Sequence, residues 1–149
     1  MRKTQEAIDF LDQLKKLDLM IENKLIEKEQ WMHIASGVSA VSIGERVQTT
    51  PNLQKMESAV CKAILIENEI NECIDRLIDA KMDVIRVIEQ LPVSEYDLIH
   101  KKYVQYIELD EIARMADKSY SWATSTHGRA LAKVQQILNK RKVQTNGAV

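Results

Sequence analysis

The feature that most limits how this chain can fold is the distance over which its apolar residues keep a helical spacing. From about residue 53 to residue 90 the apolar residues keep a helical spacing, and no proline or glycine interrupts the run. This spacing places the apolar residues on one face of an α-helix, which would be roughly 55 Å long. The stripe consists of Met56, Val60, Ile64, Ile70, Ile74, Leu77, Val84, Ile88 and Leu91.

An earlier run, from about residue 4 to residue 34, predicts a first long helix. Its apolar residues lie near a seven-residue repeat, but Lys24 and Lys28 occupy positions where a parallel coiled coil needs apolar side chains. We therefore expect an antiparallel partner helix. Residues 35–52, which include Gly37, Gly44 and Pro51, predict the loop that joins the two helices.

Taken as a whole, the chain is predicted to be all-α: a long antiparallel helical hairpin over residues 1–93, followed by a small helix-turn-helix domain over residues 94–142. Two prolines, four glycines and one phenylalanine in 149 residues favour helices over strands. A two-helix hairpin has a narrow seam and buries little apolar surface. We therefore expect the N-terminal helices to pair with another copy, as a homodimer or a higher homo-oligomer.

The C-terminal domain is predicted to begin after Pro92, which disfavours a helical residue before it. Ser94 can cap the next helix, and Glu95 and Asp97 place acids in its first turn. Its inward residues are expected to be Leu98, Ile99, Tyr103 and Val104.

Residues 111–131 predict two helices joined by a tight turn. Leu109, Ile112 and Ala116 follow the spacing of one helical face, and Asp117 then interrupts it. Ser119 can cap the second helix by accepting a hydrogen bond from the backbone. The inward residues of that helix are expected to be Tyr120, Ala123, His127, Ala130, Leu131 and Val134. The outward residues are expected to be Ser121, Trp122, Thr124, Ser125, Thr126 and Arg129. This arrangement is typical of a DNA-binding helix-turn-helix.

The segment from Tyr103 to Val134 resembles the region-four domain of bacterial sigma factors, which reads the upstream promoter element. The resemblance covers about a quarter of the chain and rests on Tyr103-Val104, Leu109-Asp110-Glu111-Ile112-Ala113, Ser119 and Arg129-Ala130-Leu131. The sequence His127-Gly128-Arg129-Ala130-Leu131 behind a long helical half is similar to a phage-encoded branch, which includes the ArpU and RinA families of late-gene transcriptional regulators. The resemblance implies promoter binding, activation of late genes and RNA polymerase as a partner.

Two residues depart from the sigma pattern. Asp117 stands where the turn usually has glycine, but aspartate tolerates the left-handed conformation that such a turn requires. Trp122 replaces a smaller residue on the outward face, and it has an alternative role as a buried core anchor. His127 is expected to be a packed histidine and not a ligand.

Charge is distributed unevenly along the chain. Residues 94–149 carry nine Lys or Arg and six Asp or Glu, and after Asp117 there are six basic residues and no acid. A basic end on a mildly acidic body is expected of a contact with double-stranded DNA. Base edges are expected to meet Ser121, Trp122, Ser125 and Arg129, and phosphates Lys118, Lys133 and Lys140. The full set of candidate DNA-binding residues is Lys118, Ser119, Ser121, Trp122, Thr124, Ser125, Arg129 and Lys133.

Other classes of function have less support in the sequence. No apolar run approaches the eighteen or so residues of a membrane span, and we expect a cytoplasmic protein. Cys61 and Cys73 lack metal-ligand spacing, and the three histidines fall in separate elements, so we expect neither a metal nor a cofactor. No nucleophile–base pair, phosphate-binding glycine loop or carboxylate pair indicates an enzyme.

Two alternatives stay open. A small subunit of a phage DNA-packaging terminase would also combine a helix-turn-helix with long oligomerising helices, but in a ring of many copies. A helical adaptor could instead bind RNA polymerase through the C-terminal domain without contacting DNA.

Overall fold

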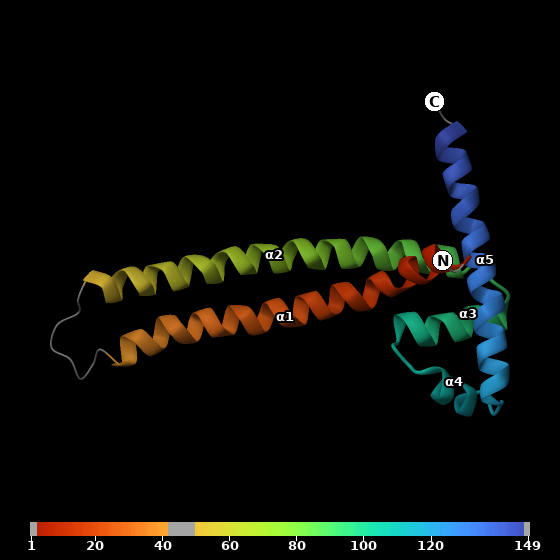
Figure 1. Cartoon of the computed structure of the whole chain (residues 1–149), viewed down its shortest axis with the longest axis horizontal. Helices are drawn as coiled ribbons and strands as arrows, with labels where there is room; N and C mark the ends of the chain where they lie inside the picture. The colour runs from red at the N-terminus through yellow and green to blue at the C-terminus, as the bar shows by residue number, and fades with distance from the viewer. Residues whose placement is uncertain (1–2, 42–49, 148–149) are drawn as a thin grey trace. The chain divides into compact units, whose positions relative to one another are not determined.

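The structure is a computed structural model that describes residues 3–41 and 50–147. Every regular element of these residues is a helix: α1 (Gln5–Val41), α2 (Thr50–Ile88), α3 (Val93–Ile99), the short π-helix η1 (His100–Val104), α4 (Leu109–Met115) and α5 (Tyr120–Gly147). The predicted all-α fold, with α1 and α2 packed as an antiparallel hairpin, is confirmed (Figure 1). Within the described residues, no helix combines the length and the apolar character needed to cross a membrane.

Two boundaries of the predicted elements were wrong. Helix α1 continues past Ile34 to Val41 and includes Gly37, because one glycine inside a helix costs only about 1 kcal/mol relative to alanine. Ser94 does not cap α3, which begins one residue earlier, at Val93. Pro51 lies in the first turn of α2, where its missing N–H has no partner to lose. Gly44 lies outside the described residues.

The chain divides into two compact units, and one of them consists of Leu17–Leu77. In this unit α1 and α2 meet along a seam of mostly small side chains. Lys24 and Lys28 lie half-buried beside it, and their ammonium groups lie 2.8 Å from Glu69 and 3.8 Å from Glu67. The ammonium group of Lys62 lies 5.7 Å from the ring centre of Trp31. The buried seam residues are Ala35, Ala59, Ala63, Ile70 and Cys73.

The apolar residues of α2 do not all face this seam. Val60, Ile64 and Ile74, which the sequence places in one stripe with Ile70, are exposed. Each of them lies one residue after a seam position, which turns it by about 100° around the helix. The single stripe expected on α2 is therefore two neighbouring stripes.

The other unit comprises Met1–Lys16 and Ile78–Val149, so it holds the residues 94–142 expected as a domain together with the start of α1 and the end of α2. The backbone N–H of Ala7, in the first turn of α1, donates to the side chain of Gln135 at 2.9 Å. Arg141 donates two hydrogen bonds, of 2.9 and 3.1 Å, to the carboxylate of Asp83. The largest fully buried residues of this unit are Leu11, Leu14, Val84, Val87, Ile88, Leu98, Ile99, Ile112, Thr126 and Val134.

Candidate nucleic-acid interface

The turn between α4 and α5 has the backbone geometry of a Schellman motif. Asp117 has a φ of 57°, which confirms that aspartate takes the left-handed conformation here. The N–H of Lys118 donates to the carbonyl of Ala113 at 2.8 Å, and that of Asp117 to the carbonyl of Arg114 at 3.1 Å. These two bonds satisfy carbonyls at the end of α4 that would otherwise lack a partner. The turn thereby fixes where α5 starts.

Helix α5 starts as the sequence predicted, with Ser119 as its cap. The hydroxyl oxygen of Ser119 accepts a hydrogen bond of 3.1 Å from the backbone N–H of Trp122, and its carbonyl accepts one of 3.2 Å from Ala123. The first turn of α5 contains no acidic residue. The positive end of the helix dipole is therefore not neutralised by an acid of that turn.

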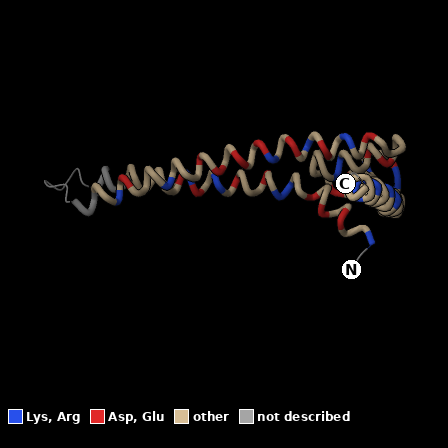
Figure 2. Tube along the Cα trace, turned by 90° about the horizontal axis from the view of Figure 1, so that it is seen from above, with Lys and Arg blue, Asp and Glu red and all other residues tan. Residues whose placement is uncertain are grey.

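The exposed face of α5 carries small polar groups and basic residues. Ser121, Ser125 and Arg129 are exposed and follow one another at four-residue steps, which places them along one side of the helix, and the exposed Lys118 lies in the turn just before it. From Tyr120 to Gly147 the helix has no acidic residue, and its tube in Figure 2 therefore carries blue segments without red ones. This face is called the α5 face below.

The remaining predicted residues lie at the edges of the α5 face. Thr124 is exposed, but its hydroxyl donates to the carbonyl of Ser121 at 3.0 Å within the helix. Trp122 is half-buried, so it is neither the fully outward residue nor the buried core anchor that the sequence allows. Lys133 is half-buried as well. Ser119 is exposed, with its hydroxyl engaged in the cap.

Two of the predicted orientations on α5 were wrong. Thr126, expected to face outward, is fully buried, and Tyr120, expected to face inward, is 59% exposed. Both α3 and α4 pack against α5, so the helix buries a wider face than one apolar stripe indicates, and Thr126 falls within it. Tyr120 stands at the helix start and lines a hollow of about 430 Å³ with Lys102, Glu108, Leu109 and Asp110.

Gly128 is exposed within the α5 face. A methyl group added at this position would meet nothing within 4 Å, so the protein's own packing does not require glycine here. Glycine inside a helix lowers stability relative to alanine by roughly 0.5–1 kcal/mol. Without a side chain at this position, the backbone of the α5 face is open to solvent here.

A buried carboxylate lies beneath the basic edge of this face. Glu95 of α3 is only 5% exposed. The ammonium group of Lys133 donates a 3.0 Å hydrogen bond to one of its oxygens and lies 2.9 Å from the other. The Nε of Arg129 lies 3.7 Å from the same carboxylate. Two predicted DNA-contacting cations thus also balance an internal charge.

A second, partly buried polar pair joins α5 to η1. The phenol oxygen of Tyr103 and Nε2 of His127 are hydrogen-bonded at 2.7 Å, and the two rings stack with their centres 5.7 Å apart. Burial lowers the pKa of His127 to about 4, with a smaller contribution from the nearby Lys102. Burial also raises the pKa of the Tyr103 phenol well above its usual value. Both groups are therefore uncharged at neutral pH, as expected of a packed histidine.

The shifted pKa of His127 predicts a loss of stability in mild acid. The unfolded histidine takes a proton near pH 6.5, whereas the folded one resists protonation until about pH 4. The unfolded state therefore binds more protons within this window, and the free energy of unfolding falls as pH drops through it. Urea titrations at pH 7.0 and 5.5 should show this fall, and His127→Gln should reduce it. The exposed His33→Gln serves as the control; an equal reduction there would contradict the assignment to His127.

Sequence reasoning missed both of these pairs. The helical spacing placed Tyr103 and His127 inward correctly, and both are at least partly buried. It could not pair them, since they lie on separate elements. The sequence predicts Glu95 as a first-turn acid of α3; it does lie in the first turn but is buried. One signal in the sequence indicates the burial of Glu95: it stands three residues before the apolar Leu98, which places both residues on the same side of the helix.

Comparison of the chain with protein-family models, with curated proteins and with solved structures gave no match. Within the described residues, no three His, Cys, Asp or Glu side chains gather in a group that could hold a metal ion. The function must therefore follow from the residues and geometry of the chain itself.

Proposed function

We propose that this chain binds duplex DNA through the α5 face and acts as a transcriptional regulator of the phage type. The observation that carries the proposal is a capped helix, set at a fixed turn after α4, whose exposed side presents Ser121, Ser125 and Arg129, with Lys118 exposed in the turn before it. A recognition helix presented in this way fits the major groove of B-DNA. The role in activating late genes, and RNA polymerase as a partner, rest on the resemblance to sigma region four.

The residue types suit a division of tasks along the helix. Ser121 and Ser125 are short hydroxyl side chains that can approach base edges closely, and Arg129 can donate two hydrogen bonds to guanine. Lys118, at the turn, is placed to meet a phosphate, and the start of α5 offers its dipole to the same charge. Gly128 has no side chain, so nothing projects from the helix in the middle of the face.

The charges favour weak binding by a single copy. Arg129 and Lys133 already balance Glu95, and α4 carries Asp110 and Glu111 in its exposed first turn. Because neutralised phosphates supply most of the non-specific affinity, one copy lacks the contacts of a strong independent binder. Two copies on two half-sites, or RNA polymerase beside one copy, would supply the difference.

The direct test is binding of a labelled duplex, followed by fluorescence anisotropy at several salt concentrations starting from about 50 mM. We expect wild-type binding at low salt, and Lys118→Ala should weaken it for all sequences and reduce the salt slope by about one. Lys55→Ala, on the exposed side of α2, removes the same charge elsewhere and should have no effect.

Two outcomes would contradict DNA binding. One is absence of duplex binding by the wild type at the lowest salt concentration. The other is an equal effect of Lys118→Ala and Lys55→Ala. In either case a helical adaptor that contacts only RNA polymerase becomes the better description. If binding holds, mapping the sites on the genome that encodes the chain separates a promoter reader from a packaging protein.

A further inference from the structure

The second apolar stripe of α2 is exposed and runs beside the seam that packs against α1. Three of its residues each follow a buried seam position by one: Val60 after Ala59, Ile64 after Ala63 and Ile74 after Cys73. The exposed Ile78, four residues after Ile74, continues the same face. One residue corresponds to a turn of about 100°, so these side chains form a face of their own. It is called the α2 stripe.

The α2 stripe has the spacing of an interhelical seam. Because α2 is one continuous helix from Thr50 to Ile88, its phase is kept throughout. The steps from Val60 to Ile64 and from Ile74 to Ile78 are each four residues, and the polar Glu67 and Asn71 occupy the stripe positions between them. Alternating steps of three and four residues define the seam of a coiled coil. This helix is therefore patterned for two partners, of which α1 is one.

The order of residues in the stripe shows which partner fits. If a second α2 runs antiparallel about a two-fold axis at Glu69, then Ile64 faces Ile74 and Val60 faces Ile78. The same register places Glu67 opposite Asn71, whose amide can donate to a carboxylate. Further out it places Glu57 opposite Lys81, and both of these residues are exposed. In this register each apolar residue therefore faces an apolar residue, and each polar residue faces one of complementary charge or hydrogen-bonding character.

A parallel arrangement of the same two stripes lacks this match. It would place Glu57 against Glu57, Glu67 against Glu67 and Lys81 against Lys81 of the other copy. Like charges directly opposite one another are unfavourable. The charge pattern therefore selects the antiparallel orientation.

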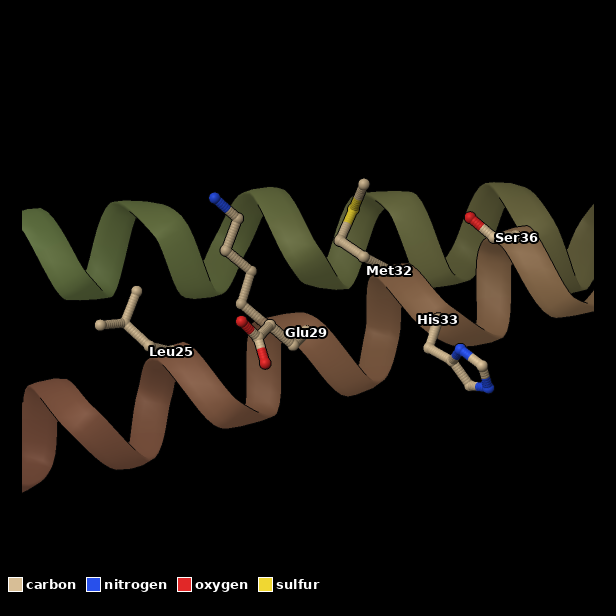
Figure 3. A pocket seen from close by; sticks show the side chains of 6 residues that line it. Leu25, Glu29, Met32, His33 and Ser36 are labelled. Atoms are coloured by element: carbon tan, nitrogen blue, oxygen red, sulfur yellow. The ribbon is translucent and has the colours of Figure 1, made fainter.

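Helix α1 has exposed apolar residues beside the middle of the α2 stripe. The 2.8 Å pair between Lys24 and Glu69 places Leu25 near the middle of the α2 stripe. Leu25 and Met32, which follow the half-buried Lys24 and Trp31 beside the seam, line a shallow groove with Glu29 and Ser36 (Figure 3). In an antiparallel pair of right-handed helices, residues that follow the seam turn to the same side of both helices.

We propose that a second copy of this chain docks on this face, with the two α2 helices antiparallel about Glu69 and the two Leu25 side chains near the same axis. The contact completes a four-helix arrangement and covers apolar side chains that one hairpin leaves exposed. It does not depend on DNA binding, since none of these residues belongs to the α5 face.

The first test measures the mass of the full chain in solution by sedimentation equilibrium without DNA. The wild type should be a dimer in the micromolar range, and Ile64→Glu should weaken the dimer at least a hundredfold, as should Ile74→Glu. Leu65→Glu is the matched control, because Leu65 is 61% exposed against 53% for Ile64 but lies outside the stripe. It should leave the dimer unchanged, and circular dichroism should show unchanged helix content in all three variants.

Three results would overturn the proposal: a monomeric wild type, equal effects of Ile64→Glu and Leu65→Glu, or a ring of many copies. Because these measurements contain no DNA, they fail or succeed separately from the proposed function.

A second test fixes the orientation by disulfide trapping in a Cys61→Ser background, which removes the exposed native thiol. Chains carrying Ile64→Cys, mixed with chains carrying Ile74→Cys, should form a disulfide between copies on oxidation, because the antiparallel register brings these positions face to face. Chains carrying Ile64→Cys alone should not. Rapid cross-linking of Ile64→Cys with itself would indicate a parallel contact and overturn the proposed register.

Discussion

Replacing Lys133 by alanine is expected to lower the free energy of unfolding by about 2–3 kcal/mol, although the residue lies at the edge of an exposed face. The reason is Glu95, which is 5% exposed and has the ammonium group of Lys133 within 3.0 Å. Removing one partner of a buried ion pair typically costs roughly 3–5 kcal/mol, because the other charge stays buried without compensation. The expected loss is smaller here because Arg129, 3.7 Å away, still faces the carboxylate.

Urea unfolding of four chains measures this interaction: the wild type, Lys133→Ala, Glu95→Gln and the double variant. Glutamine keeps the shape of Glu95 without its charge, so the double variant should be more stable than Lys133→Ala alone. Lys140→Ala, an exposed lysine of the same helix, should change stability by less than about 0.5 kcal/mol. Equal losses for Lys133→Ala and Lys140→Ala would show that Glu95 does not depend on its partner.

Replacing Ser125 by glutamate is expected to weaken duplex binding about a hundredfold, which corresponds to about 2.7 kcal/mol. Ser125 lies in the middle of the α5 face between Ser121 and Arg129. A carboxylate at this position would face the negatively charged groove, and like charges placed against one another in an interface cost several kcal/mol. Since Ser125 is exposed, the folded chain should accept the substitution.

Anisotropy titration of the same duplex at low salt measures the effect. Gln144→Glu makes the same change of net charge near the other end of α5, about 28 Å along the helix axis at 1.5 Å per residue, and its effect on binding should be small. If both variants weaken binding equally, the loss reflects net charge alone and the α5 face is not the contact surface. Unchanged binding in Ser125→Glu would exclude the proposed interface outright.

The helices themselves could be predicted because their causes are local. The helical conformation of α1 and α2, the cap at Ser119 and the left-handed conformation of Asp117 depend on residues within a turn or two, and the structure bears out all three. The errors occurred where a local signal was weak. Gly37 does not end α1, and α3 begins without a cap from Ser94.

The orientation of side chains could be predicted only in part. An apolar stripe marks the centre of a buried face but not its width, because the width depends on how many elements pack against the helix. Thr126 is buried since both α3 and α4 cover α5, while Tyr120 is exposed at the helix start. On α2, one continuous apolar pattern conceals two faces with different partners.

By itself, the sequence determined which segments are helical, where α5 starts and which sign of charge it carries, because spacing, capping and composition act over a few residues. Only the tertiary structure decided that Lys133 neutralises Glu95, 38 positions earlier, and that Tyr103 meets His127, 24 positions later. Such pairs arise from the packing of separate helices, and no local pattern records which helix lies beside which. The packing also left the α2 stripe uncovered, and we expect its partner to be a second copy of the same chain.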